Sequence, residues 1–181
     1  MEKCRLVFSG SGGQGIITAA ILIAEAAVLY EGLIAVQSQA YGPAARGGAA
    51  RSDVIISDSQ INYPKVIQPN VLVCLTQLAY DKFSSIVRPG GFLLTDSRYV
   101  KISRKSDARQ VELPMHGTVM EKIGKPVVFN ICVLGVLLSL IDLVRPESIM
   151  KVLGTRTPFE YLGMNQEALD LGIEMGAMSR K

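Results

Sequence analysis

Short strand-like apolar runs and longer helix-like stretches alternate along this chain. The first apolar run, Leu6–Ser9, leads through a cluster of glycines into an almost wholly apolar stretch, Gly15–Tyr30. This stretch predicts a helix that is covered on most of its sides. Gly32 is expected to end the helix, because glycine adopts the left-handed cap conformation at little cost. A second strand is expected at Leu33–Val36.

The same alternation continues through the middle of the chain. Asp53–Ser57 and Gln60–Tyr63, separated by a two-residue turn, are expected to form an antiparallel hairpin. Further apolar runs, each followed by a helix-like segment, are typical of strands buried in a parallel sheet. These strands are expected at Val71–Leu75, Phe92–Thr95 and Val111–Leu113, with helices at Gln77–Val87, around Gly117–Ile123 and near Asn130–Val144. We therefore predict a doubly wound α/β fold: a mostly parallel sheet with helices on both faces and an antiparallel hairpin.

The end of the chain is expected to add two helices and one irregular segment. Pro146 opens a short helix, Gly154–Gly163 is expected to be irregular, and a capped helix begins at Asn165. The apolar stretch near Asn130–Val144 contains polar interruptions and is shorter than a membrane span, so it predicts a buried helix. A length of 181 residues favours one domain covering residues 1–181.

Charge and cysteine content narrow the function classes. The chain has 19 Lys and Arg against 16 Asp and Glu, a net charge of +3, and no basic cluster or base-stacking motif, so nucleic acid is not an expected partner. Cys4, Cys74 and Cys132 lie far apart, which favours reduced thiols in the cytoplasm over a disulfide framework or a metal motif. The N-terminus lacks the features of a signal peptide, and no membrane association is expected.

A glycine loop between the first strand and the first helix is the clearest sign of ligand binding. Gly10, Gly12 and Gly15 match the G-x-G-x-x-G pattern, and Gly13 adds a fourth glycine. A loop at a helix N-terminus presents backbone N–H groups that favour an anion such as phosphate. Gln14 could orient a ligand oxygen or a neighbouring loop. The alternative is that the glycines only make a tight turn.

Two common nucleotide-binding motifs fit this loop poorly. A dinucleotide site needs an acidic residue at the end of the second strand, where this chain has Gln37–Gln39, while Glu31 precedes that strand. A phosphate-binding P-loop needs Lys and Ser or Thr where this chain has Ile16 and Ile17. Nucleoside triphosphate hydrolysis is therefore not expected.

A second glycine-rich segment, Tyr41–Asp53, carries two arginines. Arg46 and Arg51 flank Gly47 and Gly48, so two planar cations lie beside a backbone that other groups can approach closely. The guanidinium fork suits phosphate or carboxylate. The alternative is that one or both arginines pair with Asp53 or with a carboxylate of a neighbouring subunit.

Catalytic residues are not evident in the sequence. His116 is the only histidine and occupies a turn, and neither a Ser/His/Asp nor a Cys/His set can be assembled. The chain therefore predicts ligand-binding loops without a catalytic centre of its own.

At these motifs the chain resembles the gamma subunit of the 2-oxoacid:ferredoxin oxidoreductases, and it is most similar to the 2-oxoglutarate branch. The segments that carry the resemblance are Gly10–Gly15, Ala19–Ala27, Ser38–Asp53, Ile61–Pro64 and Leu75–Lys82. Two departures are Ala44, where glutamate is frequent, and Asn70, where aspartate is usual.

The resemblance implies a subunit of an enzyme of anaerobic metabolism. Such an enzyme decarboxylates a 2-oxoacid, transfers the acyl group to coenzyme A and reduces ferredoxin. Thiamine diphosphate, magnesium and iron–sulfur clusters are then expected on partner alpha and beta subunits, with a ferredoxin-like delta subunit as a further candidate. The isolated chain is expected to be inactive.

The resemblance also gives the glycine and arginine motifs an expected role in binding coenzyme A. The candidate residues are Gly10, Gly12, Gly13, Gln14, Gly15, Tyr41, Arg46, Gly47, Gly48 and Arg51. They would help position coenzyme A in a cleft that this chain completes. Two other functions stay open: a stand-alone nucleotide-binding oxidoreductase and a purely architectural subunit.

Overall fold

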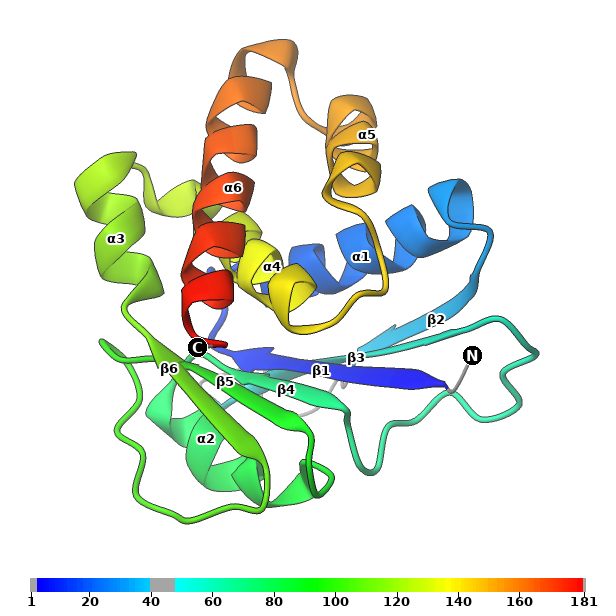
Figure 1. Ribbon diagram of the computed structural model, residues 1–181, viewed down its shortest axis with the longest axis vertical. Helices are drawn as coiled ribbons and strands as arrows, with labels where there is room; N and C mark the ends of the chain where they lie inside the picture. The colour runs from blue at the N-terminus through cyan, green and yellow to red at the C-terminus, as the bar shows by residue number, and fades with distance from the viewer. Residues whose placement is uncertain (1–2, 40–47, 181) are drawn as a thin grey trace.

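A six-stranded mixed sheet forms the centre of the computed structural model, which describes residues 3–39 and 48–180 (Figure 1). The strands lie in the order β2-β3-β1-β4-β5-β6. Their bounds are β1 Cys4–Gly10, β2 Ile34–Gln39, β3 Ala50–Ser57, β4 Val71–Cys74, β5 Phe92–Asp96 and β6 Arg109–Leu113. The pairs β1–β4, β4–β5 and β5–β6 are parallel, whereas β3 runs antiparallel to both of its neighbours, β1 and β2.

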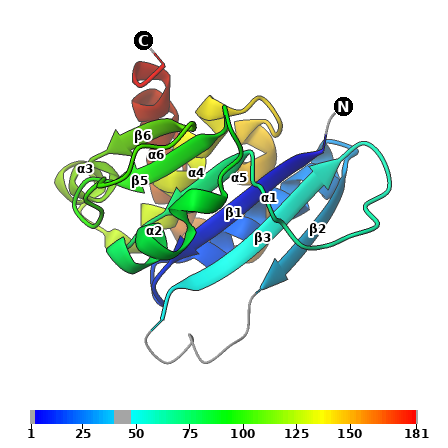
Figure 2. The same cartoon turned by 90° about the horizontal axis from the view of Figure 1, so that it is seen from below.

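Helices cover the two faces of this sheet unequally. In the described part of the chain, five helices pack on one face and α2 packs on the other (Figures 1 and 2). Their bounds are α1 Ile16–Tyr30, α2 Gln77–Phe83, α3 Met115–Lys122, α4 Phe129–Leu140, α5 Pro146–Arg156 and α6 Leu162–Met178. The prediction of a mostly parallel α/β sheet with helices on both faces and an antiparallel strand pair is confirmed.

The hairpin predicted within residues 53–63 is wrong in its second strand. Asp53–Ser57 does belong to β3, but Gln60–Tyr63 forms no strand. Both edges of β3 are already paired, to β1 on one side and to β2 on the other, so no edge is left for that segment. The antiparallel hairpin of the fold is instead β2–β3.

The predicted end of α1 at Gly32 is confirmed, whereas the irregular segment predicted near the C-terminus is wrong in part. Gly32 adopts φ +66°, and the Leu33 N–H donates to the Ala27 carbonyl at 3.1 Å, which closes α1 as expected. Gly154–Gly163, by contrast, is not irregular throughout, because α5 continues to Arg156 and α6 begins at Leu162. Arg156 pairs with Glu25 of α1, a tertiary contact that no local pattern reveals.

Helix α4 is the most enclosed helix of the larger core, with eleven of its twelve residues buried. It packs closely against α6 because glycines replace side chains where the two backbones meet. A Cβ at Gly135 would overlap the Leu169 carbonyl oxygen, and a Cβ at Gly172 would overlap the Cys132 carbonyl oxygen. Gly176 approaches Ser139 in the same way. The α4–α6 contact therefore depends on three positions without side chains.

The burial of α4 agrees with its interpretation as a core helix. None of the helices in residues 3–39 and 48–180 is long and apolar enough to cross a membrane.

We expect Gly135→Ala to lower the free energy of unfolding by about 3 kcal/mol or more, because the added methyl overlaps helix backbone that cannot move without separating α4 from α6. Urea denaturation followed by circular dichroism measures the change. Gly154→Ala is the matched control: it lies in α5 with nothing within 4 Å of its Cβ, and it should raise stability by about 0.5–1 kcal/mol. Equal effects of the two substitutions would contradict the close-packing account.

Candidate functional site

The glycine loop lies where the chain leaves the sheet toward opposite faces. After β1 the chain enters α1 on the five-helix face, and after the neighbouring parallel strand β4 it enters α2 on the other face (Figure 2). In open α/β sheets the carboxyl ends of two such strands bound the crevice in which ligands bind. Residues 11–15 and the Leu75–Thr76 turn lie at this edge of the sheet.

The glycines of this loop have three different structural roles. Gly13 and Gly15 adopt φ +87° and +70°, a region that other residues rarely occupy. Gly10 ends β1 against Gln14, Ile16 and Leu75, where a Cβ would be crowded. Gly12 and Gly13 instead face open space, with nothing within 4 Å of a Cβ built there. The outer part of the loop is therefore exposed backbone.

The Gln14 side chain joins the loop to the end of β4. Its Nε2 donates to the Leu75 carbonyl at 3.0 Å, and its Oε1 accepts from the Ser11 N–H at 2.8 Å. Both ends of the amide are engaged within the chain. Of the two roles considered from the sequence, the structure shows Gln14 orienting a neighbouring segment, the end of β4.

Asn130, at the start of α4, contacts the same loop at Gly15. Its Nδ2 donates to the Gly15 carbonyl at 3.3 Å, and a Cβ at Gly15 would lie 2.7 Å from that nitrogen. Sequence analysis did not identify Asn130 as a site residue. A single amide near the start of an otherwise apolar helix was the available signal.

Among the described residues, the N-terminus of α1 has neither a side-chain cap nor an acidic residue in its first turn. Gly15 is the N-cap and has no side chain, and the first turn contains no acidic residue. Ile17 and Thr18 are exposed there. The partial positive charge of the helix end therefore faces outward beside the exposed Gly12–Gly13 backbone, which favours an anion at this point.

Arg51 forms an ion pair within the chain. Its Nε and Nη2 donate to the two carboxylate oxygens of Asp53 at 2.6 and 3.0 Å, and Nη2 also donates to the Val66 carbonyl at 2.6 Å. The guanidinium lies 5.4 Å from the centre of the Phe83 ring, on the α2 face. One of the alternatives raised from the sequence, pairing with Asp53, is therefore what the structure shows for Arg51.

The rest of the arginine-glycine segment is only partly described. Gly48 lies two residues before Ala50, which pairs with Gly10, so Gly48 is close to the glycine-loop edge of the sheet. Tyr41, Arg46 and Gly47 lie outside the described residues.

His116 belongs to an aromatic cluster at the same edge of the sheet. Its ring meets Tyr99 and Phe129 edge to face, with centroid distances of 5.2 and 5.4 Å. Its backbone N–H donates to the buried Asp96 carboxylate at 2.7 Å, which anchors the first turn of α3. The ring contacts and the backbone hydrogen bond account for the position of His116 as a packed residue.

The thiols of the three cysteines have raised pKa values. Burial raises the pKa of Cys4 to about 11 and that of Cys74 and Cys132 to about 12, far above the range of nucleophilic thiolates. The described residues also contain no group of three or more His, Cys, Asp or Glu side chains that could hold a metal ion.

Comparison with known proteins agrees with this α/β subunit architecture. The sequence profile of the pyruvate ferredoxin/flavodoxin oxidoreductase family matches residues 5–175. The chain is 42% identical to 2-oxoglutarate synthase subunit KorC of Methanocaldococcus jannaschii, over 92% of this chain and 90% of that protein. The chain therefore belongs to this oxidoreductase family.

Solved structures support the same assignment. The gamma subunit of a keto/oxoacid ferredoxin oxidoreductase from Geobacter sulfurreducens superposes with a TM-score of 0.87 at 38% identity, covering 97% of this chain and 99% of that chain. The 2-oxoglutarate:ferredoxin oxidoreductase of Magnetococcus marinus, with 2-oxoglutarate, coenzyme A and succinyl-CoA bound, shares the fold with a TM-score of 0.85 at 22% identity. It covers 98% of this chain and 32% of that longer chain. This protein is thus a gamma-type subunit of a 2-oxoacid:ferredoxin oxidoreductase, most similar to the 2-oxoglutarate enzymes.

Two glycines of the loop should respond differently to alanine. Gly15→Ala combines φ +70° with contact on Asn130 and should cost roughly 2–4 kcal/mol of stability, whereas Gly12→Ala should change stability by less than about 0.5 kcal/mol. Denaturation of the two variants side by side tests this. A Gly15→Ala protein as stable as Gly12→Ala would contradict the crowding of Gly15 against Asn130.

The raised thiol pKa values predict a loss of stability in alkali. Below pH 9.0, the ordinary thiol pKa, folded and unfolded chains both keep the Cys4 proton. Between pH 9.0 and about 11 the unfolded thiol ionises first, so stability falls as pH rises. The melting temperature should decline over this interval, and Cys4→Ala should decline less steeply. An identical slope would contradict the burial effect.

Proposed function

We propose that the complex containing this subunit oxidatively decarboxylates 2-oxoglutarate, transfers the acyl group to coenzyme A and passes two electrons to ferredoxin. The similarity to 2-oxoglutarate synthase subunits supports this choice of acid. The ligands bound to the Magnetococcus marinus enzyme support coenzyme A as the acyl acceptor. We also propose that the complex works in the cytoplasm, in keeping with three unpaired cysteines.

Within that complex, we propose that the glycine loop holds a phosphate group of coenzyme A. The observation that carries this proposal is the exposed Gly12–Gly13 backbone beside the uncapped N-terminus of α1. Donors that are fixed before the ligand arrives reduce the entropy lost on binding. Gln14 and Asn130 supply this rigidity through Leu75 and Gly15.

The two arginines are proposed to act differently. Arg51 orders the segment around Val66 through Asp53, and the Asp53 carboxylate offsets its charge, so its proposed role is to position this segment near the ligand. Arg46, four residues before Ala50 in sequence, is proposed as the direct phosphate partner together with Tyr41, Gly47 and Gly48. A guanidinium is well suited to this role because it can bind phosphate oxygens in a bidentate manner.

The chemical step is assigned to partner subunits. We propose that alpha and beta subunits, with a ferredoxin-like delta subunit where one is present, carry thiamine diphosphate, magnesium and the iron–sulfur clusters. This chain would then contribute proximity, by holding coenzyme A against the reacting centre. We propose that all 181 residues act as one domain in this role.

A stand-alone dinucleotide-binding function is less well supported. Glu31, an acidic residue, precedes β2 in the chain and accepts hydrogen bonds from Arg145 and Ser148. Hydrogen bonds from these two residues lower the pKa of Glu31 in spite of its desolvation, so it serves as an anchor for α5. No acidic residue occurs in the sequence from Ile34 to Arg51 to take the ribose-binding role.

Arg46→Ala in the assembled enzyme should raise the KM for coenzyme A by about tenfold, the effect of losing one charge-assisted phosphate contact. Coenzyme-A-independent decarboxylation should keep its rate. Arg109→Ala is the control, since Arg109 lies on the edge strand β6 and packs over Phe92. If Arg46→Ala leaves coenzyme A kinetics unchanged and disrupts assembly instead, the architectural function replaces the proposed one.

A further inference from the structure

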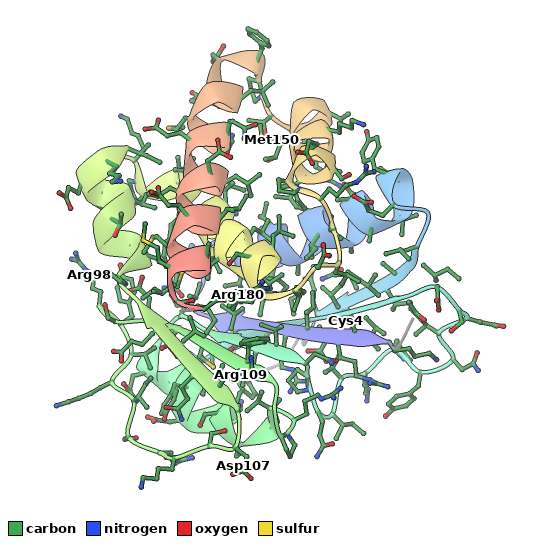
Figure 3. The ribbon with its side chains drawn as sticks, viewed as in Figure 1. Cys4, Arg98, Asp107, Arg109, Met150 and Arg180 are labelled. Carbon is green, nitrogen blue, oxygen red and sulfur yellow. The ribbon has the colours of Figure 1, made fainter. Side chains whose placement is uncertain are left out.

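A cavity lies at the opposite end of β1 from the glycine loop. It has a volume of about 710 Å³ and is bounded by the start of β1, the segment after β3 and the turn before β5. Cys4, labelled in Figure 3, marks this end of β1 and lies between two of the lining residues, Lys3 and Arg5. The seven residues of β1 separate this cavity from the glycine loop by roughly 20 Å at the usual rise per residue.

Cationic side chains surround this cavity. Lys3, Arg5, Lys65 and Arg88 line it, and no acidic side chain is among the described residues that do so. The whole protein carries a net charge of only +3, so four cations around one hollow are a marked concentration of charge. We name these four residues and the hollow they surround the basic pocket. Concentrated positive charge in a concave site attracts and retains anions.

The backbones of the two arginines of the basic pocket, Arg5 and Arg88, both bond to the Pro69–Asn70 turn. The Asn70 side chain accepts the Arg5 N–H at 2.9 Å, and the Asn70 N–H donates to the Arg5 carbonyl at 2.7 Å. The adjacent Pro69 carbonyl accepts the Arg88 N–H at 3.1 Å. The backbones of both arginines are therefore fixed relative to each other. Because Asn70 is neutral, it fixes Arg5 without adding negative charge.

The two lysines are also anchored. Lys3 Nζ donates to the Gln60 carbonyl, a neutral acceptor, at 3.0 Å. Lys65 lies between two tethered residues, since the Pro64 carbonyl accepts from Ser38 and the Val66 N–H donates to Asp53. The segment that the sequence analysis assigned to a hairpin strand is thus a fixed wall of the pocket.

The lining also offers an apolar and aromatic surface. Ile55, Ile61 and Pro89 contribute to the walls, and the Tyr63 side chain is 59% exposed. Asn62 adds an amide that can donate and accept hydrogen bonds. A volume of about 710 Å³ is in the range of sites for nucleotide-sized ligands. A ligand that matches both parts of the lining has phosphate groups joined to a flat ring system.

We propose that the basic pocket binds the diphosphate and the base of a nucleoside diphosphate group, at a site separate from the glycine loop. Arg5, Lys65 and Lys3 contact the phosphates, and the Tyr63 ring packs on the base. This inference goes beyond the proposed function, because the two sites lie at opposite ends of the sheet and on different loops.

Calorimetric titration of the full chain with ADP, pyrophosphate and adenosine tests the proposal. We expect ADP to bind at least about tenfold more tightly than either pyrophosphate or adenosine, because only ADP uses both surfaces. Arg5→Gln combined with Lys65→Gln should weaken ADP binding by about tenfold or more. Lys65→Gln alone, in a loop outside the sheet, should weaken it about threefold and guards against a folding defect in β1.

A conservative substitution and two controls complete the experiment. Asn70→Asp keeps an oxygen acceptor for the Arg5 N–H but adds a negative charge, so it should weaken ADP binding while circular dichroism stays unchanged. Lys122→Gln removes an exposed cation of α3 and should have no effect. Gly13→Ala should leave ADP binding intact even where it alters coenzyme A kinetics, which separates this inference from the proposed function.

Three results would overturn the proposal. They are ADP binding that the pocket substitutions leave unchanged, ADP binding that Gly13→Ala removes, and pyrophosphate binding as tight as that of ADP. Absence of ADP binding to a folded chain at millimolar concentration would overturn it as well.

Discussion

The close approach of α4 to its neighbours is the constraint on which the rest of the structure depends. Gly135 in α4 and Gly172 in α6 bring two helix backbones into contact, and this contact sets the depth of α4 in the core. At its start, α4 brings Asn130 against Gly15, so the same helix fixes the loop at the end of β1. Packing of the core and geometry of the proposed anion site are therefore linked through one buried helix.

The sequence predicted the order of strands and helices along the chain but not their arrangement in the sheet. Apolar runs indicate that Val71–Cys74 and Phe92–Asp96 are buried strands, because each run is bounded by turn residues. The antiparallel insertion of β3 between β1 and β2 depends on pairing across distant segments, which a local pattern does not contain. The expected strand at Gln60–Tyr63 failed for this reason: its alternation was suitable, but β3 had no free edge.

In the candidate site, too, some features could be predicted from the sequence and others could not. The tight turn of the glycine loop could be predicted from the sequence, because glycine is the residue type that adopts positive φ angles at little cost. Gly13 and Gly15 do adopt positive φ angles. The partners of Gln14 and Gly15 could not be predicted, since Leu75 and Asn130 are 61 and 115 residues away in the chain. For Arg51, both alternatives were visible in the sequence, and only the geometry of Asp53 and Val66 decided between them.

The two hydrogen bonds of the Gln14 side chain affect how an anion can approach this subunit. Because both ends of its amide are bonded, to Ser11 and to Leu75, Gln14 has its polar groups engaged within the chain, and the exposed Gly12–Gly13 backbone forms the outer rim of the loop. A rim contacts an anion from one side only. A ligand held there keeps its opposite side exposed, so a further contact, from the proposed Arg46 or from a partner subunit, is needed to exclude water from the bound group.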